Sequence, residues 1–460
     1  MFSGTKLLIC AFTNIISTVD GVDDAAFDNL EQEVFELLAE KLSKMPDPDE
    51  RHAYVEALIK GIAPDTQKKE IDRIIKDSES FSPIDDYIND EDVEDIMINN
   101  TSNIFVYKTS AGQSVKVPEM IQSRRELEKF LVKLRMYTTS ALPNKKILDG
   151  HLPSGSRINS VDSPIGPDIT IRNFKRTMLS IIDLVRFGEM SYQMAGRLWL
   201  YVDGLKVRPA NLVIGGMPAS GKTTLLNAMF SFFRSDERII VIEDTYELNT
   251  ETQENCVRLE TSIDMDLQHL ISNAMRMRPD MLIVGEVRGE EAKDMMTAMN
   301  IGKICMSTIH ASNTRDVITR LENRPMSIER EVIPLIDSII VVSQVRDREN
   351  NQVRKITQVS EISGIETKIL LSDLYTYDYK TREGSDILPS ITYREILSKV
   401  SGFSPADIIA EEQRRAKILE QLERMGIRDI RGINEFCKAY YDNPMRALKK
   451  INMEKLGTLY

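Results

Sequence analysis

The chain has 460 residues, which is too long for a single hydrophobic core and predicts two or three domains. A hydrophobic content of 42%, a charged content of 28% and a formal net charge of −12 describe a globular protein without general affinity for nucleic acid or anionic membranes. The four cysteines, Cys10, Cys256, Cys305 and Cys437, are far apart and form no C-x-x-C pair. They therefore predict neither a zinc site nor a disulfide framework, and they favour a reducing cytoplasm.

Residues 1–80 predict a helical leader. Apolar residues recur at three- and four-residue spacing between Phe27 and Leu42, which makes one apolar helical face, and further amphipathic runs follow. The leader is expected to pack as a small bundle on its own apolar faces, with a docking surface for a partner as the alternative. The apolar run at residues 7–16 is too short to span a bilayer and is expected to be a buried structural segment.

Residues 81–175 predict a smaller, mixed α/β domain. Short β-rich runs separated by turn residues occur between residues 96 and 117, and Ser123-Arg-Arg-Glu126 is a capping box that opens a helix. Two later strands each carry an arginine, Arg157 in one and Arg172 in the other.

After an expected linker over residues 176–190, strands and helices alternate through residues 191–370. Such alternation implies a parallel sheet with helices on both faces, and open sheets of this kind bind ligands at the carboxyl ends of their strands. Residues 371–460 are expected to be mostly helical, with Ser404-Pro405 as one helix start.

The stretch Gly216-Met-Pro-Ala-Ser-Gly-Lys-Thr223 fits the pattern G-x-x-x-x-G-K-[ST] and stands between a predicted strand and a predicted helix. Backbone N–H groups in such a turn, together with the helix N-terminus, hold the phosphates of a nucleotide. Lys222 is expected to reach the β- and γ-phosphates, and the Thr223 hydroxyl is expected to coordinate Mg²⁺. The residues predicted to bind the nucleotide are Gly216, Pro218, Ala219, Ser220, Gly221, Lys222, Thr223 and Thr224. ATP and Mg²⁺ are therefore the predicted cofactors.

Carboxylates follow two of the predicted strands, where hydrolysis would need them to orient water and neutralise charge. Glu243, Asp244 and Glu247 follow one strand, and Glu286 follows the other. The second strand ends in Val-Gly-Glu rather than in the usual aspartate, so Glu286 is the predicted group on the Mg²⁺ side. His310 ends a third strand, where it could contact the γ-phosphate, although a lone histidine is more often packed or solvent-facing.

Four sequence boxes resemble, in order, those of the secretion-ATPase superfamily of type II and type IV secretion and type IV pilus systems. They are the Walker A loop at 216–223, an Asp box at 242–247, an atypical Walker B box at 278–289 and a His box at 306–311. Segments 152–157 and 169–172 resemble the two arginine segments of the superfamily's smaller domain. The tail, from Arg320-Leu-Glu322 to Gly426-Ile-Arg-Asp429, resembles the archaeal branch, which includes archaellum motors and pilus-assembly ATPases.

The resemblance implies a RecA-like P-loop domain in a cytoplasmic, homohexameric ATPase that acts on pilin-like subunits at a membrane platform. It gives Glu247 the role of activating water and Glu286 an association with Mg²⁺, and it brings Arg157 and Arg172 toward the nucleotide. The zinc insert of many bacterial members is missing, and the first 80 residues are shorter than the leader typical of archaellum motors.

The function predicted from these features is that of a ring-forming motor ATPase, peripheral at the inner face of the cytoplasmic membrane. ATP binding would draw the smaller domain onto the P-loop domain, and hydrolysis would release it. The first alternative is a hexameric motor that moves nucleic acid. The negative net charge of the chain and the absence of clusters of aromatic and basic residues disfavour it. The second is a regulator that binds ATP without hydrolysing it, which the set of carboxylates disfavours.

Overall fold

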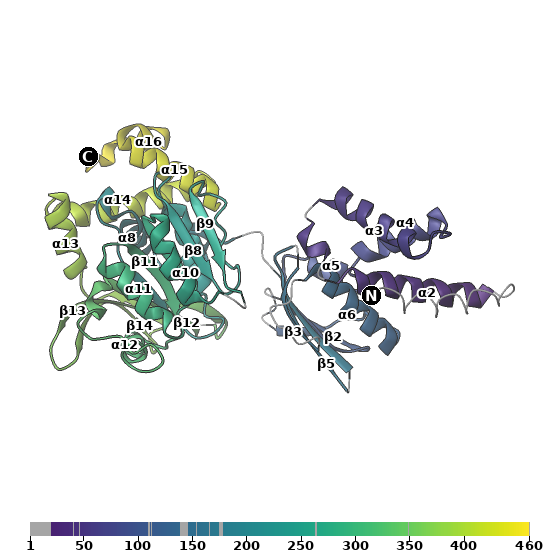
Figure 1. The fold of residues 1–460 in the computed structure, drawn as a ribbon. Coiled ribbons are helices and arrows are strands. Elements are labelled where there is room, and N and C mark those ends of the chain that lie inside the picture. Colours follow the sequence, from purple (N-terminus) through teal and green to yellow (C-terminus); the bar gives the residue numbers. More distant parts are fainter. Residues whose placement is uncertain are drawn as a thin grey trace. The chain divides into compact units, whose positions relative to one another are not determined.

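The chain divides into two compact units, which are described separately. A computed structural model gives an N-terminal unit, Met1–Arg176, and a C-terminal unit, Thr177–Tyr460 (Figure 1). The residues that the structure describes are 20–39, 41–45, 47–108, 111, 113–138, 146–152, 154–164, 166–173, 178–262, 265–347 and 349–459. The apolar run at residues 7–16 lies outside them. The division between the units falls between Arg176 and Thr177, and the linker bounds expected from the sequence stay a prediction.

The described helices of the N-terminal unit are α2 (Asp20–Leu37), α3 (Pro48–Ile62), α4 (Lys68–Glu79), α5 (Asp85–Ile88) and α6 (Arg124–Tyr137). Two of them, α3 and α6, begin at side-chain caps. Asp47 caps α3 by accepting a hydrogen bond from the N–H of Asp49, and Ser123 caps α6 by accepting one from the N–H of Glu126. Each cap satisfies a backbone donor that the first helical turn leaves without a partner.

The sheet of the N-terminal unit is antiparallel, with its six strands in the order β3-β2-β1-β6-β5-β4. The strands are β1 (Val93–Asn100), β2 (Asn103–Lys108), β3 (Gln113–Lys116), β4 (Ile147–His151), β5 (Arg157–Ser163) and β6 (Gly166–Arg172). Side chains alternate between the two faces, so that Ile158 and Ile171 are buried while Arg157 and Arg172 are exposed. The buried face shares one core with Val34 of α2 and with residues of α3, α4 and α6. The helices of the predicted leader therefore pack on this sheet.

The C-terminal unit contains a nine-stranded sheet with the order β15-β14-β13-β12-β7-β11-β10-β8-β9. Its strands are β7 (Leu212–Gly215), β8 (Ile239–Glu243), β9 (Cys256–Glu260), β10 (Met281–Val284), β11 (Ile304–Ile309), β12 (Ser338–Arg346), β13 (Gln352–Ile365), β14 (Ile369–Asp378) and β15 (Glu383–Asp386). The six strands from β12 to β9 pair in parallel, and β13, β14 and β15 extend the sheet by antiparallel pairing. The predicted parallel sheet is confirmed.

Helices cover both faces of this sheet (Figure 1). The core on one side of the sheet contains residues of α7 (Ile181–Arg186), α8 (Tyr192–Asp203), α9 (Lys222–Ala228), α13 (Thr392–Ser401), α14 (Pro405–Arg424), α15 (Ile430–Asp442) and α16 (Pro444–Lys450). The core on the other side contains residues of α10 (Leu267–Ala274), α11 (Glu291–Asn300) and α12 (Thr314–Glu322). Successive side chains of β8 enter opposite cores, Ile239 and Val241 on one face and Ile240 and Ile242 on the other. This explains the continuous apolar run in the sequence. The predicted fold is confirmed: a RecA-like P-loop domain, a smaller mixed α/β domain and a helical C-terminal region.

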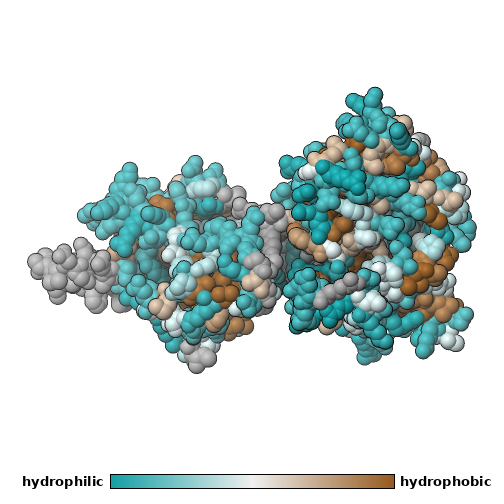
Figure 2. Space-filling model, turned by 180° about the vertical axis from the view of Figure 1, so that it is seen from behind, coloured by the Kyte–Doolittle hydropathy of each residue, from teal (hydrophilic) through white to brown (hydrophobic). Residues whose placement is uncertain are grey.

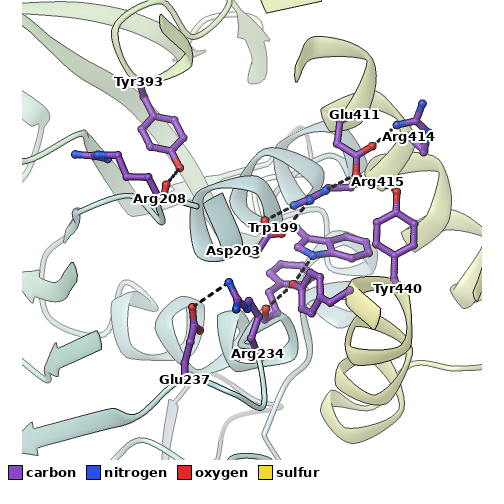
Figure 3. A network of polar contacts seen from close by, with 12 residues as sticks. Trp199, Asp203, Arg208, Arg234, Glu237, Tyr393, Glu411, Arg414, Arg415 and Tyr440 are labelled. Carbon is purple, nitrogen blue, oxygen red and sulfur yellow. Dashed lines mark hydrogen bonds and ion pairs between the residues drawn. The ribbon is translucent and has the colours of Figure 1, made fainter. Parts of the chain in front are cut away.

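The C-terminal helices are held to α8 by a buried network of charges (Figure 3). The Arg415 guanidinium of α14 lies between the carboxylates of Asp203 and Glu411, with a distance of 3.0 Å from Nη2 to Asp203 Oδ2 and 3.0 Å from Nε to Glu411 Oε1. The guanidinium carbon lies 5.0 Å from the centroid of the Trp199 ring, within the range of a cation–π contact. Tyr440 of α15 donates a hydrogen bond of 2.9 Å to Glu411 Oε1. The network thus joins α8, α14 and α15.

Glu237 offers a test of how a buried carboxyl affects stability. Burial raises its pKa to about 7, although the Arg234 guanidinium 3.9 Å away opposes the rise (Figure 3). In the unfolded chain the ordinary pKa is lower, so between those two values the folded state binds more protons, and stability falls as the pH rises through this window. We expect Glu237→Gln to be more stable relative to the wild type at pH 8 than at pH 5, by up to about 3 kcal/mol. Urea unfolding at both pH values measures this, and an equal difference at both would contradict the assignment.

The face of the molecule in Figure 2 is mostly hydrophilic over each unit, and its hydrophobic residues gather in separate patches. Apolar atoms make up a large part of the surface of any folded protein. Among the residues that the structure describes, no helix combines the length and apolar character that crossing a membrane requires.

Candidate functional site

The P-loop joins the end of β7 to the start of α9, as its sequence predicts. The backbone adopts positive φ angles at Ala219 (60°) and Gly221 (103°), and at Gly221 this conformation favours a residue without a side chain. Gly216 is required by close packing instead, because a Cβ there would lie 2.3 Å from Ser220 Oγ and 2.6 Å from the carbonyl oxygen of Val342. The turn is thus tightly folded around Ser220, which is buried.

Neighbouring strands hold the P-loop in place. The N–H of Gly216 donates a 3.2 Å hydrogen bond to the carbonyl oxygen of Ile309 at the end of β11. The carbonyl oxygen of Ala219, further along the loop, accepts hydrogen bonds from Gln344 Nε2 of β12 (3.0 Å) and Arg354 Nε of β13 (3.2 Å). The loop is therefore fixed between the parallel and antiparallel parts of the sheet.

Three of the predicted site residues meet at the ends of β7, β10 and β11. Lys222 Nζ lies 3.4 Å from His310 Nδ1, and His310 Nε2 lies 2.7 Å from Glu286 Oε1. Burial and the positive charge of Lys222 lower the pKa of His310, which favours the neutral ring at pH 7. Because an ammonium group can only donate, Nδ1 of the neutral ring accepts from Lys222. His310 Nε2 and Glu286 Oε1 are in close contact without the alignment of a hydrogen bond. The arrangement places Glu286 next to the P-loop.

Arg288 and Asp244 continue this row of polar groups. Arg288 Nη2 lies 2.7 Å from Glu286 Oε2, and Arg288 Nη1 lies 3.8 Å from Asp244 Oδ2. Glu247 is exposed, and its negative charge, with that of Glu286, opposes the lowering of the pKa of Lys222 by burial. The negative charges of Glu286 and Glu247 therefore both favour the protonated form of Lys222.

Of the remaining predicted nucleotide-binding residues, Thr223 and Thr224 lie half-buried in the first turn of α9, and Pro218 is exposed.

Glu243 differs from the other carboxylates because it turns inward. It is 2% exposed, and burial raises its pKa to about 7. Its Oε1 accepts hydrogen bonds of 3.0 Å from the N–H groups of Glu247 and Leu248. Of the four carboxylates at the strand ends, Glu243 is thus part of the interior and holds the backbone of the loop that carries Glu247.

Arg157 and Arg172 lie in the N-terminal unit. They are paired across β5 and β6, so both side chains stand on the same exposed face of the sheet. Within that unit, Arg157 Nη2 lies 3.3 Å from Asp149 Oδ2, and Arg172 Nε lies 3.0 Å from Asp95 Oδ1. Their approach to a nucleotide stays a prediction.

Sequence reasoning missed several residues around the site. Gln344 and Arg354 contact Ala219 from 125 and 135 residues further along the chain, so no local pattern links them to the P-loop. Asn227 carried a signal: it stands in an apolar run of the P-loop helix, and a buried amide must find hydrogen-bond partners.

The fold and the loop together define a P-loop protein. Residues 77–366 match the type II/IV secretion system protein family, and this is more than half of the chain. The protein therefore belongs to that family.

Relatives in two lineages align with parts of the chain. The uncharacterized protein MJ0781 of Methanocaldococcus jannaschii is 35% identical over 228 residues, which are 47% of this chain and 31% of that protein. The probable conjugal transfer protein TrbB of Sinorhizobium fredii is 30% identical over 288 residues, which are 60% of this chain and 86% of TrbB. The chain thus spans about a third of the length of MJ0781.

Among solved structures, the pilus retraction motor PilT with bound ADP is similar to this chain with a TM-score of 0.48 and 15% sequence identity. The superposition covers 79% of this chain and 93% of the PilT chain.

Proposed function

We propose that this protein is a Mg²⁺-dependent ATPase that assembles into a hexameric motor and powers the assembly or secretion of type IV pilin-like subunits at a membrane platform. Membership of the type II/IV secretion family supports the proposal. The observation that carries it is the contact of P-loop Lys222 with His310, and of His310 with Glu286, at the carboxyl edge of a parallel sheet.

The residues present fit a nucleotide with Mg²⁺. Thr223 and Glu286 offer oxygen ligands, and the described part of the chain has no group of three or more His, Cys, Asp or Glu placed to hold a metal by itself. That suits Mg²⁺, which proteins usually hold through one or two carboxylates together with the phosphates of the substrate. When bound, the ion neutralises charge on the β- and γ-phosphates.

The chain's own groups divide the remaining work. Lys222 binds the phosphates, His310 contacts Glu286 and faces the γ-phosphate, and Glu247 accepts the proton of the attacking water. Arg157 and Arg172 reach the nucleotide from the N-terminal unit. Binding and hydrolysis would then change the relation between the units through the segment near residue 176, as in other enzymes that close around a ligand.

In a cell the motor would lie in the cytoplasm, attached to the inner face of the membrane through a platform protein. TrbB is named as a conjugal transfer protein, so both a transfer system and a pilus system are consistent with the family.

Release of inorganic phosphate from Mg·ATP is the test of the enzymatic proposal. The wild-type chain is expected to release phosphate, and Lys222→Ala is expected to abolish release because the phosphates lose their cationic partner. Equal release by both proteins would show that the activity comes from elsewhere.

A further inference from the structure

The loop that carries Glu247 is held from two sides by buried side chains. On one side, Glu243 Oε1 accepts hydrogen bonds from the N–H groups of Glu247 and Leu248, each 3.0 Å long. On the other, the Asn227 side chain of α9 bridges the loop: Nδ2 donates to the carbonyl oxygen of Glu247 (2.9 Å), and Oδ1 accepts from the N–H of Asn249 (2.8 Å). Both the N–H and the carbonyl group of Glu247 are therefore fixed.

These hydrogen bonds lie in the interior. Glu243 is 2% exposed and Asn227 is 4% exposed, whereas the side chain of Glu247 is open to solvent. In such surroundings a hydrogen bond is strong, and a broken one leaves a costly unpaired group, so the loop has one preferred conformation. The result is an exposed carboxylate on a rigid backbone.

Gly285 makes room for Glu243. A Cβ at Gly285 would lie 2.9 Å from Glu243 Cγ and 3.5 Å from Glu243 Cβ, so a side chain there would displace the glutamate. The glycine's own backbone is fixed as well, because its N–H donates to the carbonyl oxygen of Ile242 (2.8 Å) and its carbonyl oxygen accepts from Thr308 Oγ1 (2.7 Å). The space that Glu243 needs thus explains why a glycine stands at position 285, where a usual Walker B strand ends in a carboxylate.

We propose that Asn227 and Glu243 are positioning residues for Glu247, and that Asn227 links the phosphate-binding helix to the loop on which Glu247 stands. The inference rests on the proposed function, in which Glu247 activates water. Asn227 follows Lys222 by five residues on the same helix, so one rigid element carries the phosphate contact at its start and the contact with the Glu247 backbone near its end. The distance between the phosphates and the carboxylate is set through this helix.

Asn227→Ala and its matched control separate positioning from general stability. Asn434→Ala removes another buried amide of the same unit, whose Nδ2 donates to the carbonyl oxygens of Phe230 (3.1 Å) and Phe233 (3.0 Å) but not to the Glu247 loop. We expect Asn227→Ala to lower kcat by roughly 10- to 100-fold with the affinity for a fluorescent ATP analogue unchanged. Hydrogen exchange of the backbone amides at residues 247–249 should become faster. Asn434→Ala should lower the Tm and leave kcat unchanged.

A pair of substitutions at Glu243 gives an independent arm if Asn227→Ala does not fold. Glu243→Leu removes the acceptor for two N–H groups and should lower kcat. Glu243→Gln keeps an acceptor oxygen, so it should retain most of the wild-type kcat. Faster amide exchange without a fall in kcat would overturn the inference, as would equal falls in kcat for Asn227→Ala and Asn434→Ala. A wild-type chain that releases no phosphate would overturn the proposed function and this inference with it.

Discussion

Glu247→Gln is expected to lower the turnover number for ATP by about 10²- to 10⁴-fold while ATP still binds, because a neutral amide cannot accept the proton of the attacking water. The substitution keeps the size of an exposed side chain, and the contacts that hold the loop are made by the backbone of residue 247. Steady-state phosphate release gives kcat, and a fluorescent ATP analogue gives the dissociation constant. Lys222→Ala is the companion variant, and it should lose both binding and turnover.

Glu254→Gln is the matched control, because this glutamate is exposed in the same connection between β8 and β9. Its turnover should equal that of the wild type. Wild-type turnover in both Glu247→Gln and Lys222→Ala would refute the assignment of the site.

Arg415→Met is expected to destabilise the C-terminal unit by about 3–5 kcal/mol, because it leaves Asp203 buried without its cationic partner and leaves Glu411 with Arg414 as its remaining one. The side chains of Arg415, Asp203 and Glu411 are fully buried, and the Arg415 contacts join α14 to α8. Chemical denaturation followed by Trp199 fluorescence reports on this region directly, since the indole ring stacks under the guanidinium.

Arg424→Met is the control on the same helix. Arg424 forms an exposed ion pair with Glu420, and such pairs contribute about 0–1 kcal/mol. If Arg415→Met and Arg424→Met shifted the unfolding midpoint equally, the buried network would not be what anchors the C-terminal helices.

Much of the fold could be predicted from local pattern. The apolar strands β7, β8 and β10 are buried on both faces, so each appeared as an unbroken apolar run. The contact between Lys222, His310 and Glu286 was also within reach, because parallel strands bring their carboxyl ends to one edge of a sheet.

What the sequence did not reveal depends on partners far away along the chain. β15 has the sequence Glu-Gly-Ser-Asp, which has little β-propensity, and it forms by pairing with β14 inside a region expected to be mostly helical. The inward turn of Glu243 depends on space left by Gly285, more than 40 residues later. The joint core of the leader and the N-terminal sheet likewise comes from tertiary packing, which a helical pattern alone does not specify.

The central claim, a ring-forming motor ATPase, is tested most directly by measuring molecular mass by light scattering, with and without a non-hydrolysable ATP analogue. The sample should be the one used for phosphate release. The proposal predicts a shift with the analogue from the 52.4 kDa protomer to about six subunits, together with measurable turnover. A protein that hydrolyses ATP but stays monomeric with the analogue would contradict force generation by a closed ring.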